Sequence, residues 1–282
     1  MIAITGASGQ LGRLVVEDLL KTVDAAEVVT VVRNPAKVED FASRGVQVRA
    51  ADYGDVSALA KAFSGVEKVL LISSSEVGQR TVQHKNIIEA AKQAGVKLIA
   101  YTSLLHADRS PLALADEHVA TEQLLQASGL PFVLLRNGWY TENYLASVPP
   151  AVQHGVFIGS AGEGKIASAT RADYAAAAAK VLTLDNQAGK VYELAGDQAW
   201  TLAELAAEVS KQSGKPVVYQ NLSEADFKAA LQGAGLPEGF ADLLANSDSG
   251  AEKGGLFDDG HQLSKLIGRP TTSLSDSVKT AL

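Results

Sequence analysis

Residues 2–12 read IAITGASGQLG, a short run of strand character followed by glycines at positions 6, 9 and 12. A strand that passes through such a turn into a helix is the context in which glycine-rich motifs bind dinucleotides. Gly6 permits a tight turn, Gly9 lets a pyrophosphate approach the backbone, and Gly12 lets the helix pack closely. The unpaired N–H groups of the helix N-terminus then face the phosphates. The alternative, a glycine turn without a ligand, is disfavoured by strand, spacing and position together. We expect the nucleotide to contact the whole turn: Gly6, Ala7, Ser8, Gly9, Gln10, Leu11 and Gly12.

The first 135 residues alternate apolar runs with amphipathic stretches. Further runs of strand character occupy residues 28–32, 46–50, 66–72, 98–102 and 132–135. The stretches between them show helical spacing, and Asn34-Pro35 is typical of a cap followed by a first helical residue. Strands that alternate with helices predict a parallel sheet covered on both faces. The predicted fold class is therefore α/β, a Rossmann-type doubly wound parallel sheet.

The rest of the chain predicts a smaller C-terminal α/β lobe. An alanine-dominated helix at 173–184 and a strand at 190–194 are expected to complete the sheet domain. That NADP-binding domain then comprises residues 1–136 and 165–195, and the substrate lobe comprises 137–164 and 196–282. Within the lobe we expect a short helix that ends at Pro149-Pro150 and a mobile polar loop at Asp248–Asp259. Helix start signals stand at Thr201 and Ser223.

Composition narrows the classes of function. The formal net charge of −7 disfavours nucleic acid as a main partner. The chain has no cysteine, which excludes disulfides, thiolate nucleophiles and cysteine-ligated metals. Its five histidines have no metal-ligand spacing. The first strand begins at once, so we expect no secretory signal, and no apolar run reaches the roughly 18 residues of a membrane span. We expect a cytoplasmic protein.

The end of the second predicted strand bears on the choice of nucleotide. An acid about 20 residues past the glycine motif would accept hydrogen bonds from a free ribose 2′-hydroxyl. Here the strand ends in Val31-Val32-Arg33, and no acid stands at this point. A guanidinium suits a 2′-phosphate through charge and paired donors. The sequence therefore favours NADPH over NADH, the alternative being a solvated arginine ahead of a helix.

Polar residues that follow the next two strands are further candidates for nucleotide contacts. Asp52 and Tyr53 close the third strand, where the adenine edge would lie, although an ordinary turn is as good an explanation. The fourth strand ends in Ser73, Ser74 and Ser75, whose hydroxyl and backbone groups could bond sugar and phosphate. A polar loop without a ligand is the alternative there.

The usual acid–base pair of alcohol dehydrogenases with this fold is missing. That device is a tyrosine whose pKa is lowered by a lysine four positions later. None of the seven tyrosines has a lysine at that distance. Ser103 ends the fifth strand, but no sequence neighbour pairs with it. The next helix is crowded with Asp116, Glu117, His118 and Glu122, for which we favour an exposed face over a proton relay.

Several motifs together resemble the NmrA-like branch of the atypical short-chain dehydrogenase/reductases, and within it the quinone reductases. They are the glycine turn, Val32-Arg33-Asn34-Pro35, Asp52-Tyr53, Tyr101-Thr102-Ser103, Leu135 to Asn143 and Leu266 to Thr271, and they span essentially the whole chain. The resemblance implies bound NADPH, a smaller C-terminal lobe and a cleft between the lobes. It implies that Asn137 to Asn143 line the nicotinamide end and the substrate pocket. The cofactor contacts it implies are Thr102, Asn137, Gly138, Trp139 and, more weakly, Arg171.

The missing tyrosine–lysine pair indicates the reaction type. Hydride delivery to a quinone gives a resonance-stabilised anion that can take its proton from water, whereas a ketone would need an acid. We therefore expect reduction of quinones or similar conjugated acceptors by NADPH, without flavin or metal and mainly by positioning. Asn143 and Tyr140 are expected to orient substrate or nicotinamide. Tyr53, Trp139 and Tyr140 could stack on a flat acceptor, or could be core packing.

Two rival functions remain. Some members of the family are redox sensors that bind NADP(H) without turnover, so the alternative is a non-catalytic sensor that binds a protein partner. An isomerase on the same scaffold is disfavoured because it too would need the tyrosine–lysine pair.

Overall fold

A computed structural model describes residues 1–282, and by internal contacts the chain divides into two compact units. Unit 1 comprises Met1–Leu104, Asp116–Asn137 and Arg171–Tyr192; unit 2 comprises Leu105–Ala115, Gly138–Thr170 and Glu193–Leu282. The sequence-based boundaries instead place residues 105–115, 165–170 and 193–195 with the sheet, and Asn137 with the smaller lobe. Leu112 shows why the first of these segments groups with unit 2, since its side chain packs directly over Gly250.

Unit 1 is built on a sheet whose strands run in the order β3-β2-β1-β4-β5-β6-β8. The pairs from β3 to β6 are all parallel. Their bounds are β1 Ile2–Thr5, β2 Val28–Val32, β3 Gln47–Ala50, β4 Lys68–Leu71, β5 Leu98–Leu104, β6 Phe132–Asn137 and β8 Val191–Leu194. The order reverses between β1 and β4, and in doubly wound sheets ligands bind beyond the strand ends at such a point. The predicted fold class is confirmed.

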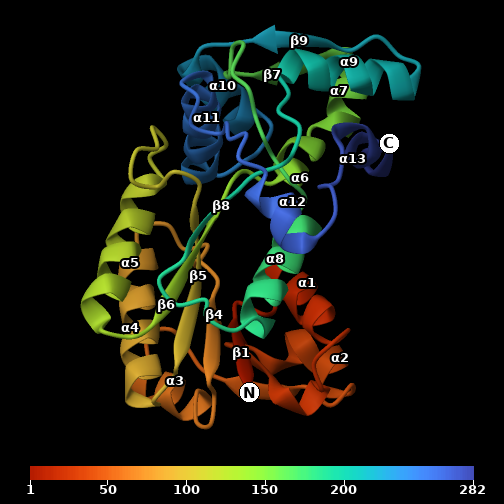
Figure 1. Ribbon diagram of the computed structural model, residues 1–282. Helices are drawn as coiled ribbons and strands as arrows, with labels where there is room; N and C mark the ends of the chain where they lie inside the picture. Colours follow the sequence, from red (N-terminus) through yellow and green to blue (C-terminus); the bar gives the residue numbers. More distant parts are fainter. The chain divides into compact units, whose positions relative to one another are not determined.

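Helices cover both faces of this sheet (Figure 1). The helices α3 (Val56–Ala62), α4 (Arg80–Gln93) and α5 (Ala115–Ser128) lie along one face, and α1 (Gln10–Leu19) and α8 (Arg171–Thr183) along the other. The alanines of α8 are mostly buried, and α8 packs against α1. Small side chains allow that close packing, because two helices approach according to the residues at their contact. A short segment, η2 (Pro35–Val38) and α2 (Glu39–Ala42), follows β2.

The local start signals in the sequence are confirmed. Asn34 Oδ1 accepts the Ala36 N–H at 3.1 Å and begins η2. Thr201 forms a reciprocal capping box with Glu204, and Ser223 caps the following helix through the Asp226 N–H. Each cap satisfies backbone donors that a helix end otherwise leaves unpaired.

Unit 2 combines helices with a two-stranded parallel sheet of β7 (Val156–Gly159) and β9 (Val218–Asn221). Its helices are α6 Thr141–Leu145, α7 Val148–His154, α9 Leu202–Ser213, α10 Glu224–Gly233, α11 Glu238–Glu252, α12 Gln262–Ile267 and α13 Leu274–Ala281. No helix of the chain has both the length and the apolar character that crossing a bilayer requires.

Two predictions within unit 2 are wrong. Pro149-Pro150 does not end a helix but lies in the first turn of α7, where a residue without an N–H is tolerated. The loop expected at Asp248–Asp259 is helical through Glu252, because α11 continues to that residue. The first polar residue of this expected mobile loop, Asp248, is buried.

Candidate functional site

The glycine turn has the geometry that a dinucleotide requires. Gly6 adopts φ +61°, a left-handed conformation that glycine adopts without strain. A Cβ on Gly12 would fall directly on the Gly6 carbonyl oxygen and 2.7 Å from Ala7 Cα, so no other residue fits there. Gly9 is the N-cap residue of α1 and provides no side-chain cap, and the first turn of the helix holds no acid. Its N-terminal N–H groups are therefore available to an anion.

Tyr53 supports this turn from β3's end. Its hydroxyl accepts the Gly6 N–H at 2.5 Å, and burial raises the pKa of Tyr53. The neighbouring Asp52 is exposed and accepts the Gly54 N–H at 2.7 Å, the geometry of an Asx turn. Contact of either residue with adenine or an acceptor stays a prediction, but the tyrosine hydroxyl already has a structural partner.

Arg33 lies at the end of β2, as predicted, but an acid faces it. The Arg33 Nη1 donates to Glu76 Oε1 at 2.7 Å, and both side chains are substantially exposed, 62% and 40%. Glu76 comes from the loop after β4, the strand on the other side of β1. Sequence reasoning missed this acid because it searched only the end of β2. The strand order would have indicated this acid, because β2 and β4 lie on either side of β1.

The Ser73–Ser75 segment is held in place by buried side chains of α4. His84 Nε2 accepts the Ser74 N–H at 3.0 Å, and Arg80 Nε donates to the Ser74 carbonyl at 2.7 Å. His84 Nδ1 lies 2.9 Å from Thr121 Oγ1. Burial lowers the pKa of His84 to about 3, so the ring is neutral and Nε2 remains an acceptor. Ser75 itself is exposed.

The predicted residues Ser73 and Thr102 lie together. The Ser73 N–H donates to Thr102 Oγ1 at 2.8 Å, which ties the loop after β4 to the neighbouring strand β5. Their hydroxyls lie 3.5 Å apart. Amide and hydroxyl groups of the loop after β4 and of β5 therefore lie side by side. Nucleotide contacts with these groups remain predictions.

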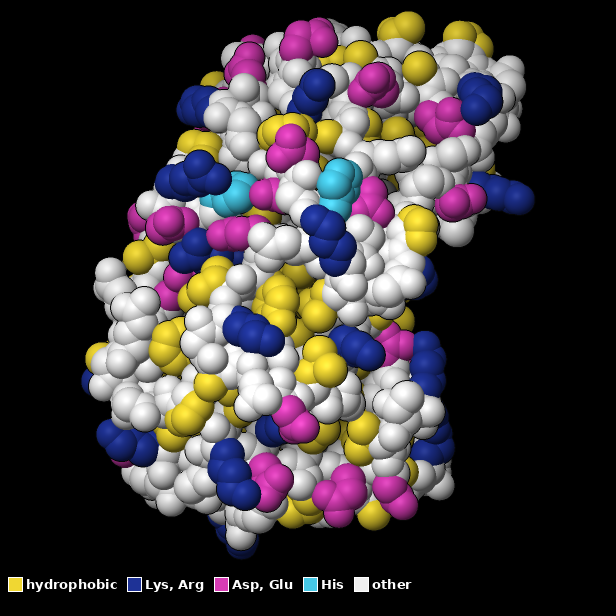
Figure 2. Space-filling view, viewed as in Figure 1, with side chains coloured by type: hydrophobic (Ala, Val, Ile, Leu, Met, Phe, Trp, Pro, Cys, Tyr) yellow, Lys and Arg dark blue, Asp and Glu magenta, His cyan; other side chains and the backbone are white.

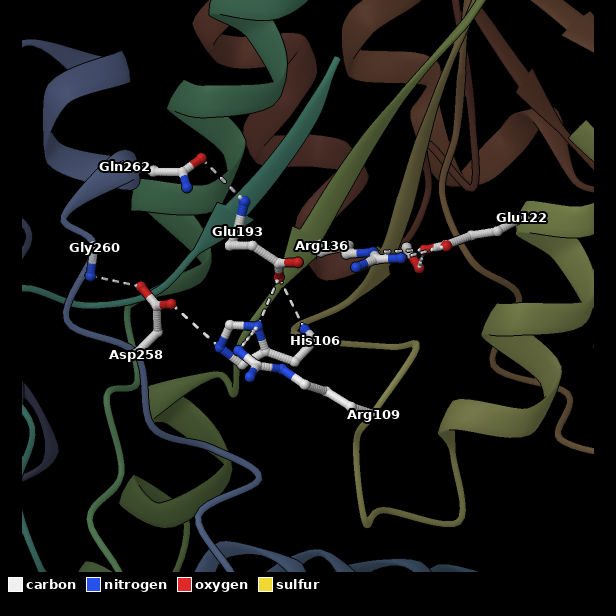
Figure 3. A network of polar contacts seen from close by, with 9 residues as sticks. His106, Arg109, Glu122, Arg136, Glu193, Asp258, Gly260 and Gln262 are labelled. Carbon is white, nitrogen blue, oxygen red and sulfur yellow. Dashed lines mark hydrogen bonds and ion pairs between the residues drawn. The ribbon is translucent and has the colours of Figure 1, made fainter. Parts of the chain in front are cut away.

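The exposed face expected on α5 is wrong for His118 and Glu122, which are buried. Glu122 accepts the Ser103 hydroxyl at 2.6 Å and takes two bonds from Arg136, Nε to Oε1 at 2.9 Å and Nη2 to Oε2 at 2.7 Å. Figure 3 shows the Arg136 guanidinium lying against this carboxylate. His118 Nδ1 lies 2.7 Å from the Tyr101 hydroxyl. Ser103, for which no partner was found among its sequence neighbours, thus pairs with Glu122, 19 positions later.

Asn137 ends β6 with a buried side chain whose Oδ1 has no hydrogen-bond partner. An orphaned buried acceptor is uncommon and calls for an explanation, such as a ligand group. Together with the uncapped start of α1 and the cradle around Gly12, it fits a bound dinucleotide. Arg171, at the first position of α8, is partly exposed, and its predicted role is not tested by these contacts.

Within unit 2, the residues after Asn137 line a small pocket of about 30 Å³. Gly138 and Trp139 are buried, and Tyr140 precedes α6, whose Asn143 N–H donates to the Tyr140 carbonyl at 3.0 Å. The pocket is lined by Trp139, Asn143, Tyr144, Ser147, Phe157, Ile158, Phe227, Leu231, Leu244 and Asp248. The orienting roles of Asn143 and Tyr140 stay predictions.

Asp248 is the buried acid of this pocket. Its carboxylate accepts the Tyr144 hydroxyl and the Ser160 N–H, both at 3.0 Å. Burial raises the pKa of Asp248 to about 6 and raises that of Tyr144 as well. The sequence contained no signal for this role, because Asp248 stands in a polar stretch.

His106, in unit 2, lies between two carboxylates (Figure 3). The His106 N–H donates to Glu193 Oε2 at 2.8 Å, and its ring Nε2 lies 3.2 Å from Asp258 Oδ2. His106 has φ +50°, uncommon for a residue with a Cβ. Asp258 also accepts the Gly260 N–H at 2.8 Å. The later part of the expected mobile loop is thus tied down at Asp258.

We expect Gly12→Ala to abolish measurable nucleotide binding, or weaken it about tenfold or more, because the new Cβ forces α1 away from the turn. Fluorescence titration with NADPH measures the effect. The matched control is Gly233→Ala, at an exposed helical position where a Cβ meets nothing within 4 Å. Binding by Gly12→Ala at the affinity of this control would contradict the assignment.

Asp248→Asn is expected to flatten the pH dependence of stability. Since the pKa of Asp248 is about 6 when folded and near 3.9 when unfolded, the folded state binds the proton more tightly. Stability contributed by this group is therefore present at low pH and falls as pH rises from about 4 to 6, by roughly 3 kcal/mol at most.

Urea unfolding of the wild type and of Asp248→Asn across about pH 4 to 7 tests this slope. Loss of a hydrogen bond in the variant adds an offset that does not vary with pH. The control is Asp242→Asn on the same helix, where the side chain is 62% exposed. This variant keeps Asp248, so it retains that residue's contribution to the dependence of stability on pH. Equal slopes in the wild type and Asp248→Asn would refute the prediction.

Comparison with known proteins agrees with this geometry. The NmrA-like family model matches residues 1–280. The chain is 69% identical over 278 residues to Quinone oxidoreductase 2 of Escherichia coli K12, covering 99% of this chain and 97% of that protein. The solved structure of the NADPH-dependent quinone oxidoreductase of Escherichia coli with NADPH is 68% identical, with a TM-score of 0.98 and 99% of each chain covered. That of Citrobacter sp. triphenylmethane reductase with NADP(H) is 41% identical, with a TM-score of 0.96 and both chains fully covered. The chain therefore belongs to the NmrA-like family.

Proposed function

We propose that this protein reduces quinones and similar conjugated acceptors with NADPH, without flavin or metal. The observation that carries the proposal is its 69% identity, over nearly the whole length, to a quinone oxidoreductase. The glycine turn, Arg33 and the orphaned Asn137 oxygen supply the features that NADPH binding needs. Catalysis is favoured over the sensor alternative because the relative is an oxidoreductase.

The residues of the chain act by binding and orientation. Helix α1 holds the pyrophosphate at its N-terminus, and Arg33 meets the 2′-phosphate. The loop at Ser73–Ser75, fixed by His84 and Arg80, bonds the ribose next to the nicotinamide. Asn137 Oδ1 would accept a hydrogen bond from the nicotinamide end, and Asn143 and Tyr140 would orient the acceptor. When bound, NADPH supplies a hydride to the acceptor.

No protein acid is needed to complete the reaction. A reduced quinone leaves as a stabilised anion and takes its proton from water. The likeness to triphenylmethane reductase supports an acceptor class that extends to conjugated triphenylmethane dyes. We place the reaction in the cytoplasm, where NADPH is available, with a small molecule as partner. Nucleic acid is not proposed, since the net charge is −7 and basic and acidic side chains intermingle on the face in Figure 2.

The direct test is the loss of NADPH absorbance on addition of a simple benzoquinone. We expect turnover by protein stripped of flavin and treated with a chelator, at the same rate as untreated protein. Gly12→Ala is the matched inactive control, because it removes the nucleotide site. Tight NADPH binding without turnover of any quinone or dye would reject the proposal in favour of a sensor.

Arg33→Gln tests the choice of nucleotide. Loss of the guanidinium is expected to weaken NADPH binding about tenfold and to leave NADH binding nearly unchanged, since only NADPH carries the 2′-phosphate. Arg44→Gln, which also removes an arginine from an exposed ion pair, serves as control. An unchanged NADPH-to-NADH ratio in Arg33→Gln would show that Arg33 does not recognise the phosphate.

A further inference from the structure

The ion pair between Arg33 and Glu76 places a carboxylate where the nucleotide's distinguishing group is expected. Their atoms Nη1 and Oε1 are 2.7 Å apart. Arg33 follows β2 and Glu76 follows β4, and these two strands flank β1 and its glycine turn. The adenosine ribose of a dinucleotide binds beside the end of the second strand. The end of β2 carries no acid of its own, and Glu76 from the loop after β4 supplies one instead.

Glu76 is held in this position by contacts other than Arg33. Its second oxygen, Oε2, accepts the Gln83 Nε2–H at 2.7 Å, and its own N–H donates to Ser74 Oγ at 3.2 Å. The Ser74 backbone is in turn fixed by His84 and Arg80. Gln83 Oε1 is buried without a hydrogen-bond partner, so the Gln83 side chain can accept a hydrogen bond beside the Glu76 carboxylate. The arrangement is built into the loop rather than formed by two free surface side chains.

The guanidinium of Arg33 and the carboxylate of Glu76 favour different nucleotides. A guanidinium binds a 2′-phosphate through charge and paired donors. A carboxylate repels that phosphate, competes with it for the guanidinium, and accepts a hydrogen bond from the free 2′-hydroxyl of NADH. We propose that Glu76 is a specificity-determining residue that weakens the preference for NADPH by competing with the 2′-phosphate for Arg33. This inference rests on the proposed function, because it concerns the same nucleotide site.

The test is the ratio of dissociation constants for NADPH and NADH in Glu76→Gln. Glutamine keeps the size of the side chain and one acceptor oxygen, but it replaces the other oxygen with an NH2 donor and removes the charge. We expect NADPH binding to tighten and NADH binding to weaken slightly, so that the ratio shifts towards NADPH by about threefold to tenfold at low salt. The shift should shrink as ionic strength rises, because both charges are exposed and screened. Fluorescence titration of each nucleotide measures the constants without turnover.

The matched control is Glu17→Gln. It makes the same charge change in unit 1 and breaks a similar ion pair, Arg44 Nη1 to Glu17 Oε1 at 2.6 Å. We expect this control to leave the ratio unchanged. An equal shift in both variants would mean that net charge alone acts and would overturn the proposal.

Two further outcomes would overturn it. Equal weakening of both nucleotides in Glu76→Gln would make Glu76 a support of the loop alone. A ratio shifted towards NADH would mean that Glu76 positions Arg33 for the phosphate instead of competing with it. Failure of the wild type to bind either nucleotide would contradict the proposed function itself, so the two failures are distinguishable.

Discussion

The close approach between α1 and the glycine turn is the constraint on which the site depends. No Cβ fits at Gly12, because the Gly6 carbonyl and the Ala7 backbone occupy that space. This contact directs the N-terminus of α1 at the place where the strand order reverses, between β1 and β4. The Gly6 N–H is then fixed by Tyr53, and the Ile72 N–H by Thr5. These two hydrogen bonds thus connect the segments that follow β1, β3 and β4.

The second determinant of the site is a buried polar layer behind the loop after β4. His84 and Arg80 satisfy the N–H and the carbonyl of Ser74, groups that would be costly to bury unpaired. Because burial lowers the pKa of His84 to about 3, this contact does not change across physiological pH. The backbone that leads into Glu76 is fixed in this way, and Glu76 in turn pairs with Arg33.

Signals that act within a few residues could be predicted from the sequence, whereas long-range partners could not. The glycine turn, the Asn34 cap and the Thr201 capping box each depend on neighbours in the chain. Glu122 was expected on the exposed face of a helix, since charged side chains are mostly exposed, and Asp248 was expected in a mobile polar loop. Their burial depends on Arg136 and Ser103, or on Tyr144 and Ser160, which other elements supply. Such pairings depend on how elements far apart in the sequence pack together, which periodicity does not reveal.

Three tyrosines with hydrogen-bonded hydroxyl groups bear on how the proposed reaction proceeds. Tyr53 accepts from the Gly6 N–H, Tyr101 lies against His118, and Tyr144 donates to Asp248. Burial raises the pKa of all three, which makes each a weaker acid than a free tyrosine. A tyrosine that serves as a catalytic acid needs the opposite shift, which a neighbouring lysine normally provides. Their hydroxyls serve packing and loop support instead. An acceptor whose reduced form is already a stable anion is the kind of substrate that such a site can turn over, because orientation of the nicotinamide is then the main demand on the protein.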